Sequence, residues 1–406
     1  MIATEERVTT VYESQKEQNR QRDLFLCIPS RIILNERGSS FFIAHGKTLH
    51  CFETADRERQ FGFHLEKTEF SWLKKLILNN YLKKMEIQIR DISVCRAYLE
   101  DAIKLIFFSM FRHRINASIL SSVYNSPLVR TWNRINPKKS IGSGIKVPEG
   151  SFEKLLNSKA PGKLGELKTM LRDKIAEGIP PSFAESREDS RDLHNFIDEL
   201  VFRINPLVFF VLAGSDEEDS RRLIQNISRE VIEYIRRFDI VNLAALLTIE
   251  LVAAAERSAL VRILEYTGNI TELLKDPNKR KTIMEKKGFR GSTVVVSLPG
   301  EMPRENRRFR FRISIHNNGA DAKEERRLME NFTEQSFSFK DGKDLKEFFK
   351  TSPSRRENSV YEDGGLCFYH LNALQDQCKK NNILLDTAIK NSYSGKSVVT
   401  TLWFGF

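Results

Sequence analysis

The sequence has 406 residues, of which 40% are hydrophobic and 29% are charged, with 28 phenylalanines and a formal net charge of +11. This composition is typical of a folded protein and excludes a chain that is disordered throughout. The length exceeds what one hydrophobic core usually supports, so we expect two or three domains.

Several features of the chain predict a cytoplasmic protein. Residues 1–23 are polar and lack the apolar core of a signal peptide, so we expect a flexible N-terminus. The longest apolar run, residues 240–255, contains Asn242 and Glu250 and is shorter than a membrane span. The five cysteines show no CxxC spacing, which is typical of reduced thiols and not of a structural zinc site. We therefore expect no membrane-spanning helix.

The positive charge is concentrated in the first part of the chain. Residues 1–150 contain 24 Lys and Arg against 16 Asp and Glu, an excess of +8. Such an excess favours acidic partners, which include nucleic acid, anionic lipid and acidic protein surfaces. Because the charges are scattered through amphipathic segments, an ordinary solvated basic face is the simpler interpretation.

The N-terminal part is predicted to begin with a small β unit. Four segments at 24–34, 39–46, 47–54 and 59–66 are rich in β-branched and aromatic residues and are separated by turn sequences. From residue 70 to about 115 the apolar spacing becomes helical. It predicts one helix through 71–92 and a second, buried helix over 96–113.

Residues 125–162 contain four prolines and several glycines, which favour loops. A further helix is predicted over 163–177. The Pro180-Pro181 pair that follows is the best domain boundary in the chain, because a proline disfavours helix in the residue before it. We therefore predict a basic N-terminal region that spans residues 24–180.

Three segments of helical period follow, at about 188–212, 216–238 and 240–265. The first two predict a helical hairpin over 188–238, whose apolar face is suited to forming a homodimer. Residues 240–406 follow the order helix, strand, strand, loop, helix, strand, strand. This order predicts the α+β class, with a two-layer α/β sandwich that has one helical face.

Four short motifs lie in this last region. A predicted helix carries Glu250-Leu-Val-Ala-Ala254-Ala-Glu-Arg257, and a predicted strand runs into Ile-His-Asn317-Asn-Gly319-Ala-Asp321. Gly364-Gly365-Leu-Cys-Phe-Tyr opens the next helix, and Ser-Gly395-Lys396-Ser precedes a closing apolar strand. None of these motifs is specific by itself. Their occurrence in this order along the chain is more informative than any one of them.

In this order the motifs resemble the Bergerat-type ATP-binding domain of histidine kinases, the Hsp90 chaperones, type II DNA topoisomerases and anti-sigma-factor kinases. The resemblance covers residues 240–406 and implies ATP or another adenine nucleotide as ligand. It assigns the role of candidate general base to Glu250. It assigns nucleotide contacts to Arg257, Asn317, Gly319, Gly364, Gly365, Gly395 and Lys396.

The sequence departs from the family pattern at the positions that bind the metal ion, the adenine base and the phosphates. Ala254 stands where the family has an Asn that supplies an oxygen ligand to Mg²⁺, so we expect no metal site. Asn317 replaces the Asp that binds the adenine amino group, and it keeps an acceptor oxygen without the charge. Asp321 and Cys367 replace glycines that let the backbone approach the ligand. These changes favour a protein that does not turn nucleotide over.

Three hypotheses about function remain open. The favoured one is a cytoplasmic signalling or regulatory protein that acts by binding a protein partner or by sensing a nucleotide. The second is an active kinase or ATPase, with Glu250 as base and Arg257 on phosphate. The third is a nucleic-acid-binding regulator that uses the basic N-terminal region. The sequence has no P-loop and no HExxH or GxSxG motif, so other common catalytic classes have no support.

Overall fold

The computed structural model describes residues 30–53, 59–64, 70–142, 151–179, 194, 197–235, 237–264, 282, 291–299, 310–317, 364–391 and 398–405. The chain divides into two compact units. The sheet unit comprises residues 1–107 and 239–406, and the helical unit comprises residues 108–238. This division differs from the predicted boundaries, because strands from both ends of the chain pair in one sheet.

The sheet unit contains an eight-stranded sheet in the order β2-β3-β1-β4-β5-β6-β8-β7. All neighbouring strands are antiparallel. Strands predicted within 24–34, 47–54 and 59–66 are confirmed, but they do not form a unit of their own, since β1 pairs with β4 and β4 pairs with β5. The strands are β1 (Ser30–Leu34), β2 (His50–Glu53), β3 (Arg59–His64), β4 (Leu82–Ile89), β5 (Ser292–Ser297), β6 (Arg310–Asn317), β7 (Leu384–Asn391) and β8 (Val398–Gly405).

Two predicted elements of this unit are also wrong. The predicted strand at 39–46 is helix α2 (Glu36–Ala44), which starts because the Asn35 side chain caps it by accepting the Gly38 N–H at 2.9 Å. The predicted helix through 71–92 stops after α3 (Phe70–Leu78), and Asn80 then takes a positive φ of 54°. Residues 82–89 form β4 instead, because Met85, Ile87 and Ile89 alternate on one face.

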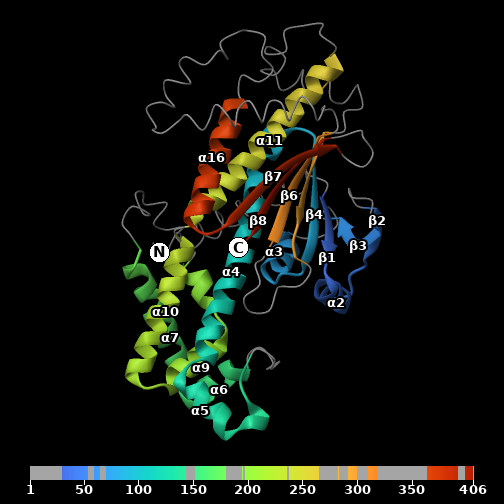
Figure 1. Ribbon diagram of the computed structural model, residues 1–406. Helices are drawn as coiled ribbons and strands as arrows, with labels where there is room; N and C mark the ends of the chain where they lie inside the picture. The colour runs from blue at the N-terminus through green and yellow to red at the C-terminus, as the bar shows by residue number, and fades with distance from the viewer. Residues whose placement is uncertain are drawn as a thin grey trace, which may run out of the picture. The chain divides into compact units, whose positions relative to one another are not determined.

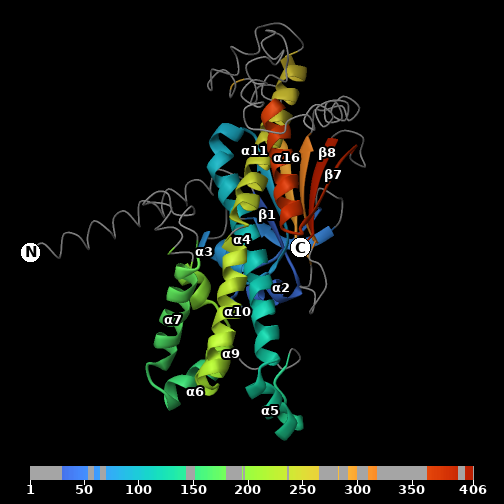
Figure 2. The ribbon, with the colours of Figure 1, turned by 60° about the vertical axis from the view of Figure 1, so that its left-hand side comes forward.

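Three helices cover one face of the sheet, as Figures 1 and 2 show from two directions. They are the first part of α4 (Ile92–Tyr124), nearly all of α11 (Phe238–Leu264) and α16 (Gly364–Lys380). The predicted buried helix over 96–113 lies within α4 and is confirmed. Phe107 of α4 packs edge-on against Phe311 and Phe404, with ring centroids 4.7 and 5.1 Å apart. These rings fix the side of the sheet on which the core lies.

The alternation of the strands separates this apolar face from a polar one. Phe311, Ile313 and Ile315 of β6 face the helices, and so the intervening side chains point to the opposite face. On that opposite face Ser314 and Thr401 form a hydrogen bond at 3.3 Å between their hydroxyl oxygens. Buried polar residues of β4, Lys84 and Glu86, belong to the same face.

The helical unit is built from the remainder of α4 and from shorter helices. The predicted helix over 163–177 is confirmed, but residues 125–162 are mostly helical where loops were predicted. Ser126 caps α5, and Pro127 occupies the first turn, where a missing N–H does no harm. The helices are α5 (Pro127–Ile135), η2 (Pro137–Lys139), α6 (Ser151–Lys159), α7 (Lys163–Glu177), a helical segment at 197–202, α9 (Pro206–Gly214) and α10 (Glu217–Ile235).

The predicted hairpin over 188–238 is therefore wrong in its first arm. Residues 188–193 lie outside the described part, and the helical segment 197–202 is followed by a break before α9. Asn205 caps α9 by accepting the Leu207 N–H at 2.9 Å, and Pro206 sets the new start. The second arm, α10, packs its apolar face inside the unit, where Tyr234 contacts Phe111 with ring centroids 5.0 Å apart.

Candidate functional site

One end of the sheet gathers the described parts of the sequence motifs. Ser292 pairs with both Ile89 and Asn317, and Val398 pairs with both Asn317 and Asn391. These five residues therefore form a row across β4, β5, β6, β8 and β7. We call this row and the helix residues beside it the motif end of the sheet.

Asn317 is the last residue of β6 and lies in the centre of that row. It has the same parity as Ile313 and Ile315, so its side chain lies on the helix-covered face. Only 3% of Asn317 is exposed. Its amide carries both donor and acceptor atoms at the boundary between the sheet and the helices.

Helix α11 reaches the same end of the sheet. Its Glu256 is 4% exposed, and its Oε2 accepts a hydrogen bond of 2.7 Å from the backbone N–H of Ile92. Ile92 starts α4 three residues after the end of β4. The carboxylate therefore binds a free N–H at the positive end of the α4 dipole, where a negative charge is favoured.

Helix α16 starts at the motif end and lies beside α11, as Figure 1 shows. Its first residues are Gly364 and Gly365. Burial lowers the pKa of His370, two turns into this helix, and the carboxylate of Glu250 on α11 partly opposes that shift. Glu250 is half-buried and lies close enough to His370 for their electrostatic interaction to be felt.

The predicted site residues divide into those that the structure places and those that it does not. Glu250, Ala254, Asn317, Gly364 and Gly365 belong to elements that meet at the motif end. Arg257 belongs to α11, but its side chain is not described. Outside the described residues lie Gly319, Asp321, Gly395 and Lys396.

Glu256 is the residue at this end that the sequence motif did not single out. The sequence pattern does not indicate it, because a contact with a residue 164 positions away leaves no local signal. Asp91, which directly precedes α4, caps the helix by accepting the Ser93 N–H at 2.9 Å, and Glu256 accepts the N–H of the residue before it.

The described residues do not fit a magnesium ion at this end. Ala254 has no ligand atom, and Glu256 already binds Ile92. Within the described residues, no group of three or more His, Cys, Asp and Glu side chains is arranged to hold a metal. An oxygen-rich site of the kind that Mg²⁺ needs is therefore not formed by this part of the chain.

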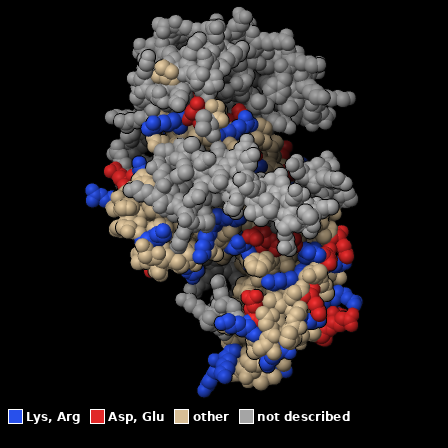
Figure 3. Space-filling model, turned by 180° about the vertical axis from the view of Figure 1, so that it is seen from behind, with Lys and Arg blue, Asp and Glu red and all other residues tan. Residues whose placement is uncertain are grey.

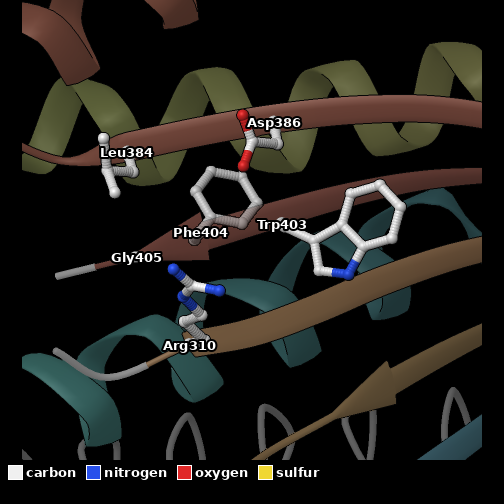
Figure 4. Close-up of a pocket in the computed structure, with 6 residues that line it drawn as sticks. All are labelled: Arg310, Leu384, Asp386, Trp403, Phe404 and Gly405. Carbon is white, nitrogen blue, oxygen red and sulfur yellow. The ribbon is translucent and has the colours of Figure 1, made fainter.

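A second feature lies at the opposite end of the same sheet, on the polar face. Figure 4 shows a pocket of about 260 Å³ beside the ends of β6, β7 and β8. Gly405 has no side chain and leaves the space that Leu384, Trp403, Arg310 and Asp386 surround. The two charged groups come from strands on either side of β8, and none of the predicted site residues lines this pocket.

One helical stretch among the described residues, Glu217–Glu256, is long and apolar enough to cross a membrane, and half of its apolar window is buried. A buried core helix of a soluble protein also meets these criteria of length and apolar composition. Ile240, Ala244 and Leu247 are almost completely buried in the sheet unit, which is the pattern of a core helix.

The chain is similar to proteins whose activity is not known. An uncharacterized protein of Treponema pallidum (strain Nichols) is 20% identical over 401 residues, which cover 94% of this chain and 98% of that protein. No solved structure matches. The model of a family of unknown function, DUF8084, matches residues 21–406, so the chain belongs to that family.

Proposed function

We propose that this protein is a regulatory protein whose sheet unit binds an adenine nucleotide at the motif end without turning it over. In this proposal the nucleotide changes the affinity of the protein for a protein partner. The base lies near Asn317, and the phosphates lie toward the start of α16.

The observation that carries the proposal is the meeting of α11, the end of β6 and the start of α16 at one end of the sheet. These elements are far apart in the sequence, but the register of β4, β5, β6 and β8 and the Glu256–Ile92 hydrogen bond bring them together. The start of α16 is the positive end of its helix dipole, which favours an anion.

The chemistry of the described residues favours binding over turnover. Turnover of a nucleotide needs a cation or cationic side chains to offset the charge that develops on the phosphates. Ala254 removes the expected metal ligand, and Glu256 is bound to Ile92.

The test is a titration of the full-length protein with fluorescent ATP, with Mg²⁺ and with EDTA, together with an assay of phosphate release. We expect saturable binding that does not need Mg²⁺, and no release of phosphate. Metal-dependent turnover that is lost in Glu250→Gln would establish an active ATPase and overturn the proposal.

A matched pair of variants locates the site. Asn317→Leu removes the amide on the helix-covered face, and Gln88→Leu makes the same change on the polar face of the neighbouring part of the sheet. We expect the first variant to lose binding by about tenfold or more, since an unpaired polar group of the ligand is left. The second is expected to bind as the wild type does.

A further inference from the structure

Helix α5 and the η2 turn form an exposed surface that is both basic and apolar. We call this surface the α5 tip, and it comprises Arg130, Trp132, Arg134, Ile135, Lys138 and Lys139. Trp132 is 45% exposed and Ile135 is 68% exposed, although both are large apolar residues. The two residues are three apart on a helix and therefore lie on one side of it.

The apolar residues of the tip are exposed although α5 packs firmly on the helical unit. Val129 of the same helix is 1% exposed. The Leu128 side chain lies against Gly214, the last residue of α9. Trp132 and Ile135 lie one and two turns further along the side that carries Leu128, beyond the buried part of the helix, and are exposed there.

Hydrogen bonds hold the tip in one conformation. The indole Nε1 of Trp132 donates to the carbonyl oxygen of Lys139 at 2.9 Å. The Asn133 side chain donates to the Ile141 carbonyl oxygen at 2.8 Å and accepts the Ile141 N–H at 2.6 Å. Because the single donor of the indole is satisfied inside the protein, the ring can enter an apolar environment without an unpaired N–H.

The charges of the tip have one sign. Arg130 and Arg134 are one helical turn apart, a spacing at which like charges destabilise a helix. Within the described residues, none of the four basic side chains of the tip forms an ion pair. The chain has eight Lys and Arg and no Asp or Glu from residue 102 to residue 148. Figure 3 shows mixed charge over much of the described surface, with Lys and Arg projecting at its lower end, where α5 lies in Figure 1.

We propose that the α5 tip binds an anionic lipid surface. The four cations are attracted to the negative headgroups, and Trp132 and Ile135 enter the boundary between headgroups and acyl chains. Trp132 suits this depth because its large ring is apolar and its N–H is already bound to the Lys139 carbonyl oxygen. Exposed Ile135 argues for lipid over nucleic acid, since an aliphatic side chain has no planar ring to stack on a base.

The experiment measures binding of the full-length protein to vesicles by flotation. One set of vesicles contains phosphatidylserine in phosphatidylcholine, and the other contains phosphatidylcholine alone. The charge variant is R130Q/R134Q/K138Q/K139Q, and the apolar variant is Ile135→Ser, which breaks no hydrogen bond seen in the tip. The control, R172Q/K174Q/R221Q/R222Q, changes the net charge equally at exposed positions elsewhere in the helical unit.

We expect binding to the vesicles with phosphatidylserine only. The charge variant and the apolar variant are each expected to bind about tenfold or more weakly, and the control is expected to bind nearly as the wild type does. Absence of wild-type binding, or an equal loss in the control, would overturn the proposal.

A parallel titration with duplex and single-stranded oligonucleotides at the same salt tests the other anionic partner. Oligonucleotide binding that the charge variant loses and Ile135→Ser retains, without vesicle binding, would assign the tip to nucleic acid and reject the lipid. Circular dichroism of each variant checks that the helical unit remains folded.

Discussion

At the scale of single residues, Glu256 shows how a buried charge is stabilised in this protein. Its carboxylate is 4% exposed and accepts the Ile92 N–H at 2.7 Å, so the start of α4 replaces the water that the charge has lost. Hydrogen bonds to an ionised acceptor are stronger than neutral ones. Glu256 therefore ties α11 to the first turn of α4, and we assign it a structural role beside the motif end.

We predict that Glu256→Ala lowers the free energy of unfolding by about 1–3 kcal/mol, because the partly buried Ile92 N–H would lose its acceptor. Urea unfolding followed by circular dichroism measures this. Glu250→Gln on the same helix is expected to change stability by less than about 0.5 kcal/mol, because the Glu250 carboxylate makes no hydrogen bond within the described part of the chain. Equal losses of stability in Glu256→Ala and Glu250→Gln would contradict the structural role assigned to Glu256.

The buried thiol of Cys378 gives a prediction about pH. Burial raises the pKa of this thiol from 9.0 to about 12. The folded state therefore holds the thiol proton more tightly than the unfolded state. Its contribution to stability is fully present below pH 9 and is lost as the pH rises from 9 toward about 12.

Thiol labelling checks the burial of Cys378, on which this prediction rests. In a variant with Ser at positions 27 and 367, the remaining cysteines are the exposed Cys51 and the buried Cys95 and Cys378. We expect Cys51 alone to react quickly at neutral pH, and Cys378 to react only when the protein unfolds. Rapid native labelling of Cys378, identified by mass spectrometry, would show that its surroundings are open to solvent.

At the scale of elements, the hydrophobic pattern predicted some helices correctly and failed at others. The helix over 163–177 could be predicted because Leu164, Leu167, Leu171 and Ile175 repeat at helical spacing over about three turns. Residues 39–46 could not, because a pair of phenylalanines fits a strand or a helix equally well. The deciding signal was Asn35, whose capping side chain was interpreted as part of a turn.

Glycines on two helices give opposite predictions at this scale. Gly38 in α2 lies against Tyr81, so a Cβ would collide with the Tyr81 carbonyl group. We predict that Gly38→Ala destabilises the sheet unit by about 1–3 kcal/mol.

Gly165 in α7 has open space around it, so Gly165→Ala is expected to stabilise the helical unit by about 0.5–1 kcal/mol. Thermal unfolding of both variants checks the signs, and a stabilising Gly38→Ala would show that α2 packs differently.

The candidate site was predictable only in part. Asn317 and the glycines at the start of α16 belong to local motifs, and local motifs can be found in a sequence. Glu256 and Ile92 meet only in the folded chain, and so no spacing indicates them. The α5 tip was hidden by its prolines, because Pro127 and Pro137 favour loops and here start helical turns instead.

At the scale of the whole molecule, the sheet joins the two ends of the chain. The β4–β5 pairing aligns Lys84–Ile89 with Ser292–Ser297 in six residue pairs, across about 200 residues of sequence. Phe107 then packs edge-on against the stacked pair of Phe311 and Phe404 from the C-terminal part. The C-terminal region that carries the motifs is thus half of a larger sheet.

We predict that a fragment of residues 239–406 does not fold by itself, because it exposes the edge of β5 and the ring surfaces that Phe107 covers. We expect a molten or aggregated product, seen as poor dispersion in an amide NMR spectrum. Coexpression with residues 1–107 is expected to restore a soluble complex. A cooperative, well-dispersed fragment alone would contradict this account of the sheet.

The measurement that tests the central proposal most directly is calorimetric titration of the full-length protein with ADP in EDTA, repeated with Mg²⁺. The proposed nucleotide site predicts one saturable binding event with the same affinity under both conditions, and its loss in Asn317→Leu. No binding under either condition, or binding that requires Mg²⁺, would contradict it.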